Sequence, residues 1–115
     1  MKTEEIILPD GKKANIWKLN YGFKSDMQGA VSKITNKGED LEINVGNVQL
    51  MTLVYGIWDS ADLFIEAPKD LELGLSTEEI NLRLKKIRGL ESGGDLLYKE
   101  INRLNKEVGE DTLKK

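Results

Sequence analysis

The 115-residue chain contains no cysteine and no histidine. Disulfides, thiolate nucleophiles and zinc sites built from Cys and His are therefore excluded. The absence of histidine also removes the commonest general base near neutral pH. Carboxylates, lysine or tyrosine can still support catalysis, so this composition disfavours an enzyme without excluding one. No cofactor-binding motif is present either, and we expect the protein to use no cofactor and no metal.

Long apolar runs are missing as well. The longest lies within residues 50–58, far short of the roughly 20 residues that span a bilayer. The first five residues, Met1–Glu5, lack the basic start and apolar segment of a signal peptide. We therefore expect a cytoplasmic protein that is not secreted and does not contact a membrane. Its length predicts one globular domain over residues 1–108, followed by a flexible polar tail at 109–115.

A concentrated basic surface, the usual mark of a nucleic-acid binder, is also absent. The net charge is −3, with 8 lysines against 12 acidic residues over 1–75 and 9 basic against 8 acidic residues over 76–115. The nearest basic group is Arg83, Lys85, Lys86 and Arg88. A solvated helix face is the favoured interpretation of these residues. A small nucleic-acid-binding regulator that uses this basic helix, 83–88, is the alternative.

Apolar residues concentrate in the stretch Asn47–Trp58, which we predict to be a central helix. Winding at about 100° per residue spreads its large apolar side chains over an arc of roughly 220°. Gln49, Thr52 and Gly56 form the remaining narrow stripe. Surface helices show an apolar stripe nearer ~100° wide. This helix must therefore be covered on most sides by its own domain, or partly by another chain, which predicts a homo-oligomer. Thr52 and Gly56 are a pair of small residues that would let another helix approach.

The N-terminal third predicts a β-hairpin and a helix. Two apolar runs, 5–8 and 14–19, flank the turn tripeptide Pro9-Asp10-Gly11. Apolar residues at helical spacing then predict an amphipathic helix over 23–35. Residues 41–45 alternate between apolar and polar, which favours a third short strand. Helical spacing from Leu41 to Val48 leaves open that this segment extends the central helix.

The C-terminal half predicts two further helices after an irregular segment, 59–75. Ser76-Thr77-Glu78-Glu79 matches a capping box. The helix that it opens has Ile80, Leu84 and Ile87 on its inner face. After Gly93-Gly94, a last helix from Asp95 has Leu97, Ile101, Leu104 and Val108 at helical spacing. We expect these two helices to pack as an antiparallel pair. The predicted fold is α+β and predominantly α-helical, with an N-terminal hairpin packed against about four helices.

Acidic and glycine-rich segments give no catalytic or binding motif. The carboxylates within 39–42 lack the alternating ligands of a calcium loop. Asp59 and Asp62 have no identifiable partner for acid–base chemistry. Gly93-Gly94-Asp95 lacks the further glycines and the lysine of a phosphate-binding loop. A solvated loop and an inter-helix turn explain these segments better.

Trp58, Phe64 and Ile65 are the candidate partner-binding residues. The central helix ends at Trp58, and the acidic segment after it continues to offer bulky apolar side chains. These residues either fold back on the core, which is the favoured interpretation, or form a surface for a protein partner.

The layout resembles that of a known family. It begins with the hairpin Ile6-Ile7-Leu8-Pro9-Asp10-Gly11, and the central helix ends with Leu53-Val54-Tyr55-Gly56-Ile57-Trp58. The final helical pair contains the run Leu97-Tyr98-Lys99-Glu100-Ile101-Asn102-Arg103-Leu104-Asn105. In order and character these segments resemble the tail assembly chaperones of long-tailed bacteriophages and related prophages.

The resemblance implies a non-enzymatic cytoplasmic protein whose partners are the tape-measure protein, the tail-tube subunits, or both. Members of that family bind the long tape-measure protein before tail-tube subunits polymerise around it, keep its apolar helical surfaces soluble, and are absent from the finished tail. Several self-associate, and many also occur in a longer form made by ribosomal frameshifting. The resemblance covers most of the chain but has no tight motif, so it assigns no binding residue.

Overall fold

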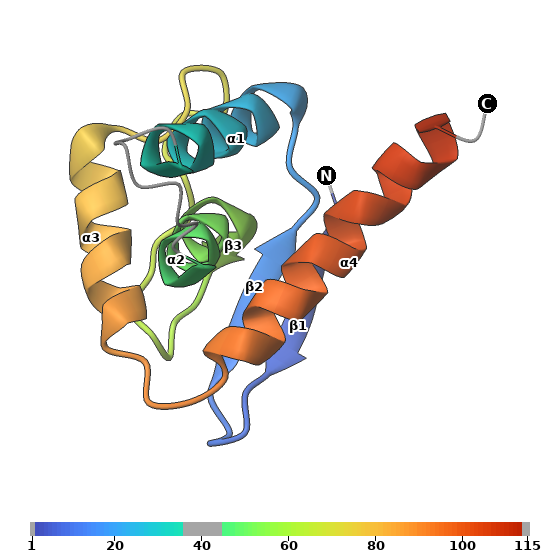
Figure 1. Ribbon diagram of the computed structural model, residues 1–115. Coiled ribbons are helices and arrows are strands. Elements are labelled where there is room, and N and C mark those ends of the chain that lie inside the picture. The colour runs from blue at the N-terminus through green and yellow to red at the C-terminus, as the bar shows by residue number, and fades with distance from the viewer. Residues whose placement is uncertain (1, 36–44, 114–115) are drawn as a thin grey trace.

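Figure 1 shows the computed structural model, which describes residues 2–35 and 45–113. Strands β1 (Thr3–Ile7) and β2 (Lys13–Trp17) are antiparallel and pair Thr3 with Trp17 and Ile7 with Lys13. The turn between them places Gly11 at φ 91°, a conformation that glycine adopts without steric cost. The Gly11 amide donates to the Leu8 carbonyl oxygen at 2.8 Å. The predicted hairpin is confirmed.

The third strand lies elsewhere than predicted. Strand β3 (Ile57–Asp59) pairs antiparallel with β2, which gives the sheet order β1-β2-β3. We predicted this segment as the end of the central helix. Most of the predicted strand 41–45 lies outside the described residues, and its last residue, Val45, begins a helix. The error arises because a short apolar run such as Ile57-Trp58 has no period that separates strand from helix.

Four helices, which make up about half of the chain, complete an α+β fold: α1 (Tyr21–Thr35), α2 (Val45–Gly56), α3 (Thr77–Arg88) and α4 (Gly94–Leu113). The Asn20 side chain accepts a hydrogen bond from the Phe23 amide at 2.8 Å, which begins α1 two residues before the predicted start. At α3, the Ser76 hydroxyl accepts from the Glu79 amide and the Glu79 carboxylate accepts from the Ser76 amide. The predicted capping box is confirmed.

Helix α2 lies at the centre and packs against α1, α3, α4 and β3 (Figure 1). The residues of its last turn, Leu53–Gly56, are all buried. Gly56 faces α4 so closely that a Cβ there would lie 2.5 Å from Cγ2 of Ile101. The small residue does allow a helix to approach, and that helix belongs to the same domain. Residues 48–51 at the other end remain half-buried.

The prediction that α3 and α4 form an antiparallel pair is wrong. Each packs chiefly against α2, and the two diverge from the turn that joins them (Figure 1). The central helix has apolar residues on most sides, so it can bury the inner faces of both neighbours at once. Burial of apolar area, and not sequence proximity, decides the partners of these helices.

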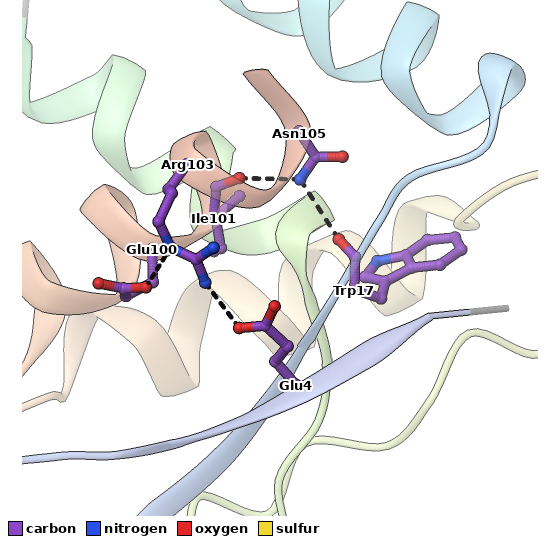
Figure 2. Close-up of polar contacts among 6 residues, drawn as sticks. All are labelled: Glu4, Trp17, Glu100, Ile101, Arg103 and Asn105. Atoms are coloured by element: carbon purple, nitrogen blue, oxygen red, sulfur yellow. Dashed lines mark hydrogen bonds and ion pairs between the residues drawn. The ribbon is translucent and has the colours of Figure 1, made fainter. Parts of the chain in front are cut away.

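Helix α4 is attached to the sheet by buried and exposed polar contacts (Figure 2). The Asn105 Nδ2 donates to the carbonyl oxygens of Trp17 and Ile101 at 3.3 and 2.9 Å, and its Oδ1 accepts from the Leu19 amide at 2.8 Å. At the surface, Arg103 bridges Glu4 of β1 and Glu100 of its own helix at 2.6 and 2.7 Å. These contacts fix α4 across β1 and β2.

No helix within 2–35 or 45–113 has the length and apolar character needed to cross a membrane. The division into a domain at 1–108 and a tail at 109–115 stays a prediction.

Candidate functional site

Arg83 is buried inside the fold, with 4% of its surface exposed. Its Nη1 donates to the carbonyl oxygens of Val54 and Ile57 at 2.8 and 2.5 Å. Its Nη2 donates to those of Trp58 and Glu66 at 2.9 and 2.6 Å. Because the last carbonyls of a helix have no partner within it, the guanidinium caps α2 from a neighbouring helix. The same group holds β3 and the segment after it.

Burial lowers the pKa of Arg83 from its ordinary value to about 10, while the negative charges of Glu79 and Asp59 act in the opposite direction. The guanidinium therefore stays protonated at neutral pH and keeps all of its donors. A buried cation of this kind is tolerated because both of its Nη groups are hydrogen-bonded to carbonyl oxygens.

This burial divides the basic group that supported a nucleic-acid-binding alternative. Lys85, Lys86 and Arg88 are exposed, whereas the Arg83 donors already bind four carbonyl oxygens. Arg83 is thus not available to contact a phosphate. Its position could have been inferred from spacing, because Ile80, Arg83, Leu84 and Ile87 fall at i, i+3, i+4 and i+7 on one helix face.

Residues 60–65 form a tight turn that presents Phe64 to solvent. Ser60 and Ile65 pair through reciprocal backbone hydrogen bonds of 2.9 Å, and the Phe64 amide donates to the Ala61 carbonyl oxygen at 3.3 Å. To close this turn Phe64 adopts φ 59°, and it is the one non-glycine residue with positive φ in the described part of the chain. Its side chain is 77% exposed.

The turn is fixed to the start of β2 by polar side chains. The Ser60 hydroxyl donates to the Lys13 carbonyl oxygen at 2.6 Å and accepts from the Leu63 amide at 3.1 Å. The Asp62 carboxylate accepts from the Lys13 amide at 2.8 Å. Phe64 is therefore held in place by a rigid support even though its own ring is exposed.

Beside Phe64 lie two residues of α3 that extend its exposed surface. The Nζ of Lys86 is 5.6 Å from the centre of the Phe64 ring, within reach of a cation–π interaction. Leu82 is 54% exposed and lines, with Phe64 and Lys86, a shallow hollow of about 140 Å³. We call Phe64, Leu82 and Lys86 the Phe64 patch.

The other two predicted partner residues are less accessible. Ile65 belongs to the core, with 5% of its surface exposed. Trp58 is half-buried, with its ring centre 5.0 Å from that of Trp17 at an interplanar angle of 57°. Trp58 accepts a hydrogen bond from Arg83 through its carbonyl oxygen, and Phe64 and Ile65 line the same hollow as Arg83, but of the three only Phe64 is well exposed. Sequence reasoning missed Leu82. This apolar residue lies outside the inner face that Ile80, Leu84 and Ile87 form, which is the signal that could have identified it.

The two acidic residues considered for catalysis act within the fold. Asp59 accepts a hydrogen bond from the Asn15 Nδ2 at 2.8 Å, which joins β3 to β2, and Asp62 supports the Phe64 turn. Over the ranges that the structure describes, no group of three or more carboxylates is placed to hold a metal ion. The acidic residues 39–42, which we predicted to form a solvated loop, lie outside the described residues.

A larger cleft of about 530 Å³ opens where α2, the end of α3 and the start of α4 meet. Its apolar lining includes Leu50 and Leu53 of α2 with Ile87 and Leu90 of the α3 end. Glu91 and Asp95 line it on the α4 side, next to Gly93-Gly94. We call it the α2–α4 cleft. The glycines act here as an inter-helix turn, with Gly93 at φ 89° and packed against Leu8.

The geometry thus offers two surfaces, the Phe64 patch and the α2–α4 cleft, that share α3. Neither combines an activated nucleophile with a general base. Comparison of the chain with protein-family models, with curated proteins and with solved structures finds no match in any of the three.

Proposed function

We propose that this protein is a non-enzymatic, cytoplasmic tail assembly chaperone of the long-tailed bacteriophage type. In this proposal it binds an apolar helical segment of a tape-measure protein during tail assembly. The observation that carries the binding function is the Phe64 patch, an exposed aromatic ring on a strained and rigidly supported turn. The resemblance of the chain to that chaperone family supplies the identity of the partner.

The backbone conformation of Phe64 supports a role outside folding. A left-handed conformation costs a non-glycine residue about 1–2 kcal/mol. A buried ring would offset that cost, whereas the Phe64 ring is mostly exposed. Strain of this kind is typically retained where a side chain serves binding or catalysis. Because no catalytic set surrounds the ring, protein binding is the function that it supports.

The chemistry of the patch fits an apolar helix. Aromatic rings are enriched at the centre of protein interfaces, where they insert into partner pockets. Leu82 adds aliphatic surface beside the ring, and Lys86 can pair with a carboxylate at the edge of the contact. A helix with an apolar stripe and an acidic flank would cover all three side chains.

Co-expression with the long helical protein encoded by a neighbouring gene tests the proposal. We expect the wild-type chain to copurify with that protein and the Phe64→Ser variant to lose it. Tyr21→Ser is the matched control, because Tyr21 is 88% exposed at the start of α1 and lies outside the patch. Circular dichroism should show all three chains to be folded. If the wild type binds no long helical partner, or if Phe64→Ser binds as well as the wild type does, the proposal is wrong.

A further inference from the structure

The α2–α4 cleft is large enough to receive side chains from a partner. Its volume of about 530 Å³ lies within the range of roughly 300–1,000 Å³ that is typical of ligand sites. Leu50 and Leu90, which line it, are only half-buried in the free chain. The cleft therefore combines exposed aliphatic surface with a concave shape, as helix-binding grooves do.

The charge of the cleft is of one sign. Among the described residues that line it, Glu91 and Asp95 are the charged ones, and no lysine or arginine is included. The nearby basic residues of α3, Lys85 and Arg88, are exposed and do not line the cleft. An apolar floor with an acidic edge selects apolar side chains flanked by cations, because complementary charges steer a partner and exclude those of like charge.

We propose that the α2–α4 cleft binds an amphipathic helical segment whose apolar face is flanked by lysine or arginine. The inference rests on the proposed function, since the segment belongs to the same partner, and it adds a second contact of opposite charge preference to the Phe64 patch. The apolar residues of the segment, at i, i+3, i+4 and i+7, lie against the half-buried Leu50 and Leu90, over the buried floor of Leu53 and Ile87. Its cations lie beside Glu91 and Asp95.

Two synthetic peptides probe this charge preference. Each has about 18 residues, long enough to form a helix, and the same leucine face. One has lysines flanking the leucines and the other has glutamates at those positions. We expect the wild-type chain to bind the lysine peptide at least about tenfold more tightly at low salt, with the difference shrinking as salt screens the charges. Isothermal titration calorimetry measures the affinity for each peptide at low and at high salt.

A cleft-filling variant tests the location. Gly94 lines the cleft, and a Cβ added there would meet nothing within 4 Å, so Gly94→Leu should fold normally while occupying the space. Gly29→Leu is the matched control, because an added Cβ at that helical glycine of α1 also meets nothing within 4 Å. We expect Gly94→Leu to weaken lysine-peptide binding about tenfold or more, and Gly29→Leu to leave it unchanged.

Reversing the acidic edge tests the chemistry directly. The double variant Glu91→Lys, Asp95→Lys should prefer the glutamate peptide over the lysine peptide. Equal binding of the two peptides by the wild type, or unchanged binding by Gly94→Leu, would overturn the inference. If Gly94→Leu binds the lysine peptide normally while the wild type still copurifies with its tape-measure partner, the cleft assignment fails and the proposed function stands. Failure of that copurification refutes the proposed function itself.

Discussion

Replacing Arg83 by methionine is expected to destabilise the fold strongly. The substitution keeps a long apolar stem but removes donors from four carbonyl oxygens. Two of the lost bonds are buried, to Val54 in the last turn of α2 and to Ile57 at the start of β3, and two are partly buried. Leaving one buried carbonyl oxygen without its donor typically costs about 1–3 kcal/mol, so the loss at the two buried acceptors amounts to about 2–6 kcal/mol. We expect a decrease of that size in the free energy of unfolding, out of a total of about 5–15 kcal/mol for a domain.

Urea unfolding at pH 7, followed by circular dichroism, measures this change. Arg83→Lys is the informative control, because one ammonium with three donors cannot reproduce a planar fork that reaches four acceptors. The free energy of unfolding of Arg83→Lys should lie between those of the wild type and of Arg83→Met. Matched substitutions of the exposed Lys85 and Arg88 should change stability by less than about 0.5 kcal/mol. If Arg83→Met costs less than about 1 kcal/mol, the carbonyl-binding role assigned to Arg83 is wrong.

Three further predictions concern α2 and the Phe64 turn. Gly56→Ala should destabilise the fold by about 1–3 kcal/mol because the new methyl group meets Ile101, whereas Gly29→Ala should stabilise it slightly. Equal effects of the two substitutions in thermal unfolding would contradict the close approach of α2 and α4. Phe64→Gly should abolish partner binding but change the free energy of unfolding by less than about 1 kcal/mol, because relief of the left-handed strain offsets the larger backbone entropy that glycine loses on folding and the loss of the Lys86 contact. A destabilisation above about 2 kcal/mol would instead make Phe64 a core residue. Burial, aided by the charge of Asp26, raises the pKa of Tyr55 above 10.0, so the folded state retains a proton that the unfolded state releases, and the free energy of unfolding should fall as pH rises above 10.0. In urea unfolding, Tyr55→Phe should lose less stability over this pH range than the wild type does, and an equal dependence of stability on pH in the two chains would refute this role of Tyr55.

The hairpin and the start of α3 could be predicted because local chemistry determines them. The turn needs a residue that accepts positive φ, which Gly11 supplies, and the α3 start needs the reciprocal bonds of Ser76 and Glu79. Both requirements are met within a few residues of chain. Periodicity also predicted that Leu97, Ile101 and Leu104 of α4 face the core, and they are buried.

Features that depend on distant residues were missed. Whether Ile57–Asp59 forms a strand is decided by the free edge of β2, and whether α3 packs against α4 is decided by the apolar surface of α2. The role of Arg83 was assigned from its charge, whereas its place in the apolar stripe of α3 indicates burial. Of the predicted partner residues, Ile65 pairs with Ser60 and is buried, whereas the residue before it, Phe64, is exposed.

Site-specific photocrosslinking shows whether the Phe64 patch contacts the partner. A photoreactive phenylalanine analogue placed at position 64 or at position 21 replaces, in each case, an exposed aromatic ring. In the complex with the tape-measure partner, we expect a crosslink from position 64 and none from position 21. A crosslink from position 21 without one from position 64 would place the partner on another face and contradict the account.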